Sequence, residues 1–327
     1  MKVAVTGGAG FIGSHVVDGL LRRGYEPRIF DLARSPHHRD PAIETMRGDL
    51  LDLEAVRGAL RGCRAVAHLA AVSDVNDVVE DPARATLVNA RGTEILLEAA
   101  RLEGVRRVVY ASTVWVYGGA NGGDPLDEDT PLAPPDHHYT ATKLAGERHC
   151  QAHQERFGLE TAILRFGIPF GPRARPATVV AAFVARAMAG KPLTITGSGA
   201  QSRQFVYVAD LADGVVAALA PQARPRTYNL VGRESLSIRA VAETVRELVA
   251  DVPIVHVHDR PADLRSVRIS GERAEQELGW KPQTSFREGV ARYVDWVSRT
   301  QGTSSASTAS STRGRAATVL RQEPGEL

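Results

Sequence analysis

The sequence predicts an α/β fold, with a doubly wound parallel sheet followed by a smaller C-terminal α/β domain. In the first half, short runs rich in β-branched residues alternate with longer stretches whose apolar residues recur at helical spacing. This alternation is typical of a parallel sheet with helices on both faces. Between residues 169 and 261, frequent prolines divide the chain into shorter pieces, which indicates a second domain rich in loops.

The predicted elements of the first half follow one another in a strand–helix order. We expect strands at 2–5, 27–30, 65–68, 107–110 and 161–165, and helices at 14–23, 83–102 and 139–157.

The chain length supports a division into two domains, because a domain takes about 150 residues and the chain has 327. We expect the first domain at residues 1–170, with a segment near 204–220 returning to it, and the second domain at 171–300. From residue 301 to 327 the chain is dominated by Ser, Thr, Ala and Gly or lacks periodicity, so we expect a disordered tail.

Composition excludes several classes of protein. A formal net charge of +2 does not fit a broadly basic nucleic-acid scaffold, and no apolar run is long enough to cross a membrane. Cys63 and Cys150 have neither CxxC nor zinc-site spacing, so we expect no metal site and a reducing, cytoplasmic location.

A glycine-rich segment directly follows the first predicted strand. Gly7, Gly10 and Gly13 form G-x-x-G-x-x-G before a predicted helix. The first glycine allows a tight turn, the second lets the backbone approach a pyrophosphate, and the third lets helix pack on strand. The helix beginning near Phe11 would direct its N-terminal N–H groups toward the phosphates. The alternative is an ordinary glycine-rich turn.

The end of the second predicted strand favours the dinucleotide interpretation. Asp31 lies about 20 residues after the glycines, where an acid binds the adenine ribose hydroxyls. A carboxylate there repels a 2′-phosphate and favours NAD over NADP, although Arg34 could soften this preference.

Tyr139 and Lys143 are four residues apart and therefore share one face of the predicted helix 139–157. A free tyrosine, with a pKa of about 10, is a poor base at neutral pH. We expect the Lys143 cation, together with a positive nicotinamide ring, to lower the pKa of Tyr139 and produce a base beside a hydride acceptor. The alternative is a surface helix with an accidental Tyr and Lys.

Together these motifs resemble the extended short-chain dehydrogenases/reductases, and within them the nucleotide-sugar epimerase/dehydratase family. The resemblance follows the chain in order to about residue 297. It rests on TGGAGFIGSH (6–15), Asp31, GDL (48–50), HLAA (68–71), NARGTEILLEAA (89–100), ASTVWVYG (111–118), YTATK (139–143), GSGAQSRQFVYVADLADGV (197–215), TYNLVG (227–232), RPAD (260–263) and LGWKP (278–282).

The resemblance implies a Rossmann NAD-binding domain, a nucleotide-sugar domain and three sets of site residues. The catalytic set is Thr113, Tyr139 and Lys143. The set for NAD is Gly7, Gly10, Phe11, Ile12, Gly13, Asp31, Asp49, Leu50, Leu69, Ala70, Ala71, Asn89, Tyr139, Lys143, Phe166 and Pro169. The substrate set is Thr113, Arg175, Arg203, Arg260 and Asp263, with Arg203 and Arg260 clamping the diphosphate. Asn89 could instead cap its helix, and Asp263 could be only a turn residue.

The implied reaction is NAD-dependent 4-epimerisation of a UDP-hexose or UDP-glucuronate through a transient 4-keto sugar. Members of the family that dehydrate at C5 and C6 carry Asp-Glu directly after the Thr, where this chain has Val114 and Trp115. UDP-glucuronate decarboxylases usually keep a Glu at the position of Trp115. Neither Val nor Trp transfers protons, so dehydration and decarboxylation lose support.

Another departure concerns the sugar. Ile168 stands where the family usually has Asn, and the following Gly171–Pro176 resembles the G-P-R-x-R-P stretch of UDP-glucuronate 4-epimerases. By that resemblance Arg175 is a candidate ligand of a sugar carboxylate. The alternative is a solvent-exposed loop arginine.

Other activities remain open at this point. The same Tyr and Lys would serve an NDP-4-keto-sugar reductase or an NDP-sugar dehydratase, and a non-catalytic dinucleotide sensor is a third possibility. The family also implies a homodimer formed partly by the Tyr-Lys helix. We expect no nucleic-acid or membrane partner.

Overall fold

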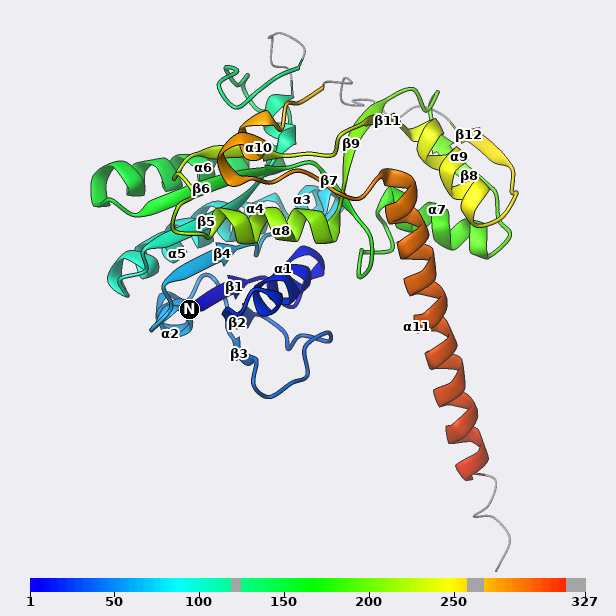
Figure 1. The fold of residues 1–327 in the computed structure, drawn as a ribbon, viewed down its shortest axis with the longest axis horizontal. Coiled ribbons are helices and arrows are strands. Elements are labelled where there is room, and N and C mark those ends of the chain that lie inside the picture. The colour runs from blue at the N-terminus through cyan, green and yellow to red at the C-terminus, as the bar shows by residue number, and fades with distance from the viewer. Residues whose placement is uncertain (119–124, 258–267, 316–327) are drawn as a thin grey trace, which may run out of the picture.

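Seven parallel strands form the central sheet of the computed structural model, which describes residues 1–118, 125–257 and 268–315, with side chains as far as residue 300 (Figure 1). Their order in space is β10-β6-β5-β4-β1-β2-β3. The strands are β1 (Lys2–Thr6), β2 (Glu26–Asp31), β3 (Glu44–Arg47), β4 (Ala65–His68), β5 (Arg107–Thr113), β6 (Glu160–Phe166) and β10 (Thr227–Leu230). The α/β class and the parallel sheet are therefore confirmed.

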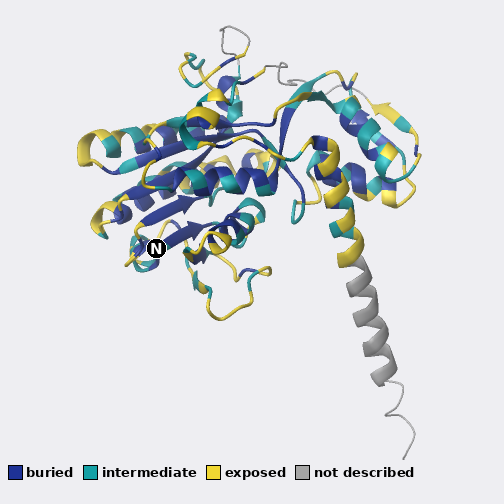
Figure 2. Ribbon diagram, viewed as in Figure 1, coloured by how far each residue is buried: buried dark blue, intermediate teal, exposed yellow. Residues whose placement is uncertain are grey.

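Helices cover both faces of this sheet because its strands are apolar on both sides. On one face, α1 (Phe11–Arg22) and α8 (Val208–Ala218) pack together, over Val3 and Val5 of β1. On the other face, α2 (Leu53–Leu60), α5 (Gly92–Leu102) and α6 (His138–Phe157) cover Ala4 and its neighbours. Figure 2 shows the strands between these layers as buried.

The structure differs from the expected helix at 83–102, which is interrupted. It contains α4 (Pro82–Thr86), a π-helical turn at Leu87–Arg91 and α5. The buried Asn89 lies in that turn, and its side-chain amide donates to the carbonyl oxygen of Val72 and to Thr142 Oγ1. Periodicity predicted the helix but not these tertiary hydrogen bonds. It also missed β3 and β10, which are short and lack a strong apolar pattern.

Most elements that follow β6 in the sequence form a second group of small sheets and helices, which we call the second layer system. A three-stranded sheet contains β7 (Ile168–Phe170), β9 (Ser202–Tyr207) and β11 (Ser235–Ser237), and β8 (Leu193–Thr196) pairs with β12 (Ile254–Val257). Around them lie α7 (Val179–Met188), α9 (Ile238–Leu248) and α11 (Phe286–Arg315). Their core includes the aromatic cluster Phe170, Phe205 and Phe286.

The chain crosses between the two layer systems more than once. It leaves the central sheet after β6, forms β9 in the small sheet, and returns as α8 and β10. After β10 the chain leaves the central sheet a second time. It returns at α10 (Glu272–Leu278), which packs on β10 and α8.

The C-terminal helix extends further than we expected. α11 continues to Arg315, whereas we expected disorder from residue 301. The segment 301–315 holds no proline and only two glycines among many Ser, Thr and Ala residues, which a helical backbone accommodates. Residues 316–327 of the expected tail lie outside the described residues. Within the part of the chain that was searched, no helix has the length and apolar character needed to span a membrane.

A buried ion pair fixes α6 against the sheet. Glu147 of α6 accepts two hydrogen bonds from Arg165 of β6, with Nε and Nη2 at 3.0 and 2.8 Å from the carboxylate oxygens. Ser112 of β5 donates a further hydrogen bond to Glu147 Oε1. Arg165 Nη1 also donates to the hydroxyl of Tyr117. Both charges are therefore compensated inside the protein.

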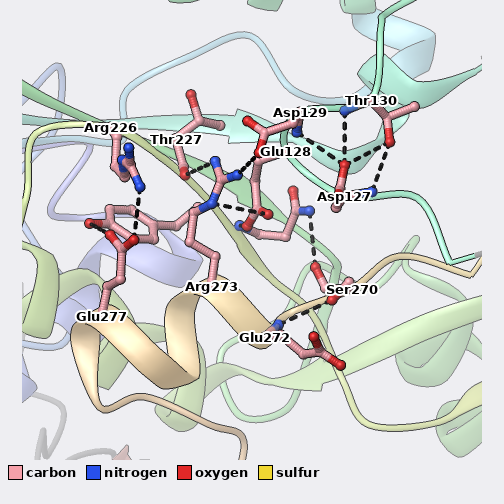
Figure 3. A network of polar contacts seen from close by, with 12 residues as sticks. Asp127, Glu128, Asp129, Thr130, Arg226, Thr227, Ser270, Glu272, Arg273 and Glu277 are labelled. Carbon is pink, nitrogen blue, oxygen red and sulfur yellow. Dashed lines mark hydrogen bonds and ion pairs between the residues drawn. The ribbon is translucent and has the colours of Figure 1, made fainter.

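This polar network continues toward α10. The hydroxyl of Tyr117 donates to Asn229 Oδ1 of β10, and the backbone N–H of Asn229 donates to Glu128. Figure 3 shows Arg273 of α10 between Glu128, Asp129 and the backbone of β10. The loop that follows residue 124 is thereby attached to β10 and α10.

We predict that Gly146→Ala lowers stability by about 1–3 kcal/mol, because the added methyl group overlaps the buried Tyr110 hydroxyl under α6. Gly58→Ala is the matched control, since its Cβ would lie 3.6 Å from Met46 Cε inside α2. Without an overlap, the control gains about 0.5–1 kcal/mol from helix propensity. Thermal unfolding followed by circular dichroism measures both, and equal melting temperatures for the two variants would contradict this packing.

Candidate active site

A cleft of about 970 Å³ lies at the carboxyl edge of the central sheet. Its walls include residues that follow or end β1, β2, β4, β5 and β6. In open α/β sheets this edge is where ligands bind. Most predicted site residues meet here: Gly7, Gly10, Phe11, Ile12, Gly13, Asp31, Asp49, Leu50, Leu69, Ala70, Ala71, Thr113, Tyr139, Phe166, Pro169 and Arg175.

The glycine loop has no room for side chains where it meets its neighbours. Gly7 has φ +70°, and a Cβ there would lie 2.8 Å from the backbone nitrogen of Ala70. A Cβ on Gly13 would overlap the carbonyl oxygen of Gly7. The loop therefore packs closely between the N-terminus of α1 and the chain after β4. The first residues of α1, Phe11, Ile12 and Gly13, line the cleft, and the N–H groups at the start of a helix are suited to bind phosphate.

Asp31 ends β2 on the wall beside this loop. Its Oδ2 accepts a hydrogen bond of 3.0 Å from the backbone N–H of Ala9, and its Oδ1 accepts one from Ala33. The carboxylate is thus held in place at the cleft, with lone pairs left to accept hydrogen bonds from ribose hydroxyls.

His68 supports the same wall from behind. Thr6 Oγ1 lies 2.7 Å from His68 Nδ1 and accepts hydrogen bonds from the backbone N–H groups of Leu69 and Ala70. His68 Nε2 lies 3.0 Å from Thr93 Oγ1. Burial lowers the pKa of His68 to about 3, so the imidazole is neutral at physiological pH.

Tyr139 and Thr113 approach the cleft from different elements. Thr113 ends β5, and its Oγ1 accepts a hydrogen bond of 3.2 Å from the backbone N–H of Trp115. Tyr139 lies in the first turn of α6, which begins after the His137 cap. A hydroxyl and a phenol therefore face the same space at the carboxyl end of the sheet.

Lys143 lies one turn after Tyr139, buried behind the cleft wall. Its Nζ donates a hydrogen bond of 2.9 Å to the carbonyl oxygen of Ala111 and lies 6.0 Å from the centre of the Tyr139 ring. Burial lowers the pKa of Lys143 to about 8. Burial raises the pKa of Tyr139 to about 12, and the positive charge of Arg175 opposes that increase. Desolvation therefore exceeds the effect of nearby charge in the chain itself. The expected lowering of the tyrosine pKa includes the charge of a bound nicotinamide ring, and it stays a prediction.

Aromatic side chains surround the phenol. The Trp115 ring stands edge-on to Tyr139, with ring centres 6.1 Å apart, and the His137 ring stacks on Tyr139 at 6.3 Å. The buried Nε1 of Trp115 has no hydrogen-bond partner, and the residue lines the cleft. Of the two residues after Thr113, Trp115 lines the cleft and Val114 does not. That they exclude proton transfer stays a prediction.

Some predicted site residues lie elsewhere. Asn89 does not line the cleft. It acts from behind, because its Oδ1 accepts from the N–H of Val72, which does line it. Arg203 is on β9 outside the cleft lining, and its Nη1 donates to the carbonyl oxygen of Ser202. Arg260 and Asp263 fall outside the described residues.

Two ion-pair clusters at the cleft were missed from the sequence. Asp18 of α1 binds His38 and Arg173, each with a 2.8 Å contact, and so joins the loops after β2 and β7. Asp74 binds Arg175, with Oδ2 3.3 Å from Nη1. The three partners of these aspartates, His38, Arg173 and Arg175, lie in loops, where no periodic signal exists. The predicted Arg175 ligand is thus in the cleft and already paired.

The fold and the site define a dinucleotide-binding enzyme, with Tyr139 in the lining of its cleft. The site fits NAD on three observations: the glycine loop at the start of α1, the Asp31 carboxylate beside it, and a single cleft of about 970 Å³ whose lining runs from there to Tyr139. A model of the NAD dependent epimerase/dehydratase family matches residues 3–231. The chain belongs to this family and uses NAD.

Known relatives within the family catalyse different reactions. The chain is 34% identical over 310 residues to a UDP-glucose 4-epimerase of Mycolicibacterium smegmatis, covering 90% of this chain and 98% of that one. It is 32% identical over 314 residues to a dTDP-glucose 4,6-dehydratase of Streptomyces antibioticus, covering 90% and 92%. The solved UDP-glucose 4-epimerase of Thermus thermophilus in complex with NAD matches with a TM-score of 0.83 at 35% identity, covering 90% and 98%.

The pKa of His68 predicts acid sensitivity of the wall behind the glycine loop. The unfolded chain takes up a proton at His68 near pH 6.5, and the folded protein does so only near pH 3. Stability is therefore lost as the pH falls through this interval, by about 2 kcal/mol between pH 7 and pH 5. His68→Gln should be less stable than the wild type at pH 7.5 but show a smaller loss on acidification. Urea unfolding of both proteins at several pH values measures the difference. Parallel pH curves would contradict this assignment.

Proposed function

We propose that this protein is an NAD-dependent nucleotide-sugar 4-epimerase acting on a UDP-hexose or UDP-glucuronate through a transient 4-keto sugar. The observation that carries the proposal is the wall of the cleft after β5. Thr113 and Tyr139 supply hydrogen-bonding and acid–base groups there, while the residues that follow Thr113 are Val114 and Trp115. Such a wall supports proton transfer at one hydroxyl, and it lacks the adjacent acid and base needed for elimination at C5 and C6.

The roles of the chain's own residues follow from their positions. Thr113 Oγ1 would hydrogen-bond the sugar C4 hydroxyl, and Tyr139 Oη would accept the proton of that hydroxyl. When bound, NAD supplies a hydride acceptor for oxidation at C4 and returns the hydride afterwards, so none is consumed. The 4-keto sugar would turn in the cleft between the two halves of the reaction, and Tyr139 would return the proton after reduction on the opposite face.

The charge balance around Tyr139 sets a condition on this role, because only the phenolate form can accept a proton. Burial keeps the phenol protonated, since it raises the pKa to about 12, and the positive charge of Arg175 favours the phenolate. Lys143 holds its ammonium against the carbonyl of Ala111, behind the ring. Proton transfer at Tyr139 would therefore depend on positive charge facing it within the closed cleft.

An NMR time course of the full chain with UDP-glucose, UDP-galactose and UDP-glucuronate, without added cofactor, tests the proposal. We expect the C4 epimer of at least one of them to appear. Tyr139→Phe should lower turnover by about 10²–10⁴-fold, because the general acid–base group is lost, while the NAD content of the purified protein stays unchanged. A 4-keto-6-deoxy product would indicate a dehydratase instead. Stoichiometric use of added NADH or NADPH with a 4-keto sugar would indicate a reductase.

We also propose that the chain forms a homodimer through the outer faces of α5 and α6. Leu102 at the end of α5 and Phe157 at the end of α6 are large apolar residues with about half of their surface exposed. Light scattering should give twice the chain mass of 35.2 kDa. The double substitution Leu102→Glu and Phe157→Glu should shift the protein toward the monomer. Val255→Glu, at an exposed apolar position on β12, is the control. A monomeric wild type would exclude the dimer.

A further inference from the structure

The cleft contains an ion pair between Arg175 and an acidic residue, Asp74, that was not predicted from the sequence. Asp74 caps α3 (Val75–Glu80), and Arg175 lies in the loop between β7 and α7. Asp74 Oδ2 is 3.3 Å from Arg175 Nη1, and Asp74 Oδ1 accepts a hydrogen bond from the backbone N–H of Asn76. Both side chains line the cleft that contains Thr113 and Tyr139.

Arg175 and Tyr139 both line the cleft. The charge of Arg175 acts on the pKa of Tyr139, so the guanidinium and the phenol lie in the same electrostatic environment. The Arg175 side chain is 47% exposed and that of Asp74 is 22% exposed. The carboxylate is thus the more enclosed partner, and its position is fixed by the start of α3.

Negative charge surrounds the pair. A second cavity of about 610 Å³ adjoins the cleft and shares Arg175 and Arg84 with it. Asp77, Glu80 and Asp81 also line this cavity. With Asp74 in the cleft, four acidic residues and two arginines therefore line these adjoining spaces, within the described part of the chain.

A hexose and a uronate differ here in one group. A uronate would bring its own carboxylate to a guanidinium that Asp74 already engages, and the two like charges would repel each other. A hexose brings hydroxyl groups, which can donate to the free lone pairs of Asp74 and accept from the remaining N–H groups of Arg175.

We propose that Asp74 is a specificity-determining residue that, by pairing with Arg175, makes the site select an uncharged hexose over a uronate. The proposal rests on the proposed nucleotide-sugar epimerase function and narrows its substrate class. Arg175 serves as a partner of Asp74 and of sugar hydroxyls, and its position does not make the site a carboxylate receptor.

The test compares the wild type with Asp74→Asn, which keeps a capping oxygen for α3. Epimerisation is measured with UDP-glucose and with UDP-glucuronate. Binding of both is measured by calorimetry, with UDP alone as the probe that lacks a sugar. The wild type should favour UDP-glucose. Asp74→Asn should raise the ratio of UDP-glucuronate to UDP-glucose, in kcat/KM and in affinity, by about tenfold or more, as expected for removal of a like charge. Affinity for UDP should not change.

Asp52→Asn is the matched control, because Asp52 caps α2 in the same way and does not line the cleft. It should leave the ratio unchanged. A wild type that prefers UDP-glucuronate, or an Asp74→Asn variant with an unchanged or lower ratio, would overturn the proposal. If the wild type epimerises neither sugar, the proposed activity fails, and the calorimetric ratio still decides the role of Asp74.

Discussion

The ion pair between Glu147 and Arg165 is the interaction on which the geometry of the site depends. It joins the middle of α6 to β6, with both charges buried and hydrogen-bonded. Tyr139 and Lys143 lie two turns and one turn before Glu147 on the same helix, so the contact that holds Glu147 also sets their height above the sheet. Ser112 joins the pair from β5, next to Thr113. One carboxylate thus aligns the two elements that carry the reactive groups.

The electrostatics of the cleft follow from this burial. Placing a phenol and an amine in a region of low dielectric favours the neutral form of each, which explains the raised pKa of Tyr139 and the lowered pKa of Lys143. Ionisation of the phenol then depends on positive charge held nearby. Arg175 provides such charge from a loop of the second layer system, and Asp74 balances it from the first. In the proposed function, acid–base chemistry and sugar recognition would therefore share the same few charges.

Much of the central sheet and of the dinucleotide site could be predicted from the sequence because local patterns determine them. The glycines directly follow β1, and the acid Asp31 is the last residue of β2. Because these strands are parallel, their carboxyl ends lie at the same edge of the sheet and bring the two features together. The π turn around Asn89 could not be predicted, since it depends on hydrogen bonds to Val72 and Thr142, distant in sequence. The partners of Asp18 and Asp74 come from separate loops, whose approach is a property of the assembled fold. The degree of desolvation at Tyr139 could not be predicted either, because motif spacing does not report burial.

The position of β10 has a consequence for how the chain folds. This strand completes the central sheet beside β6, yet about 60 residues of the chain, including β7, β8 and β9, separate the two in sequence. During synthesis, β6 therefore emerges as an open edge, with unpaired backbone groups, until residues 227–230 have been made. The second layer system is therefore largely a long insertion between β6 and β10, and most of it is synthesised before these two strands can pair. Assembly of the nucleotide-binding half is thus a late, non-local event, in which the Tyr117–Asn229 contact forms only after both parts are present.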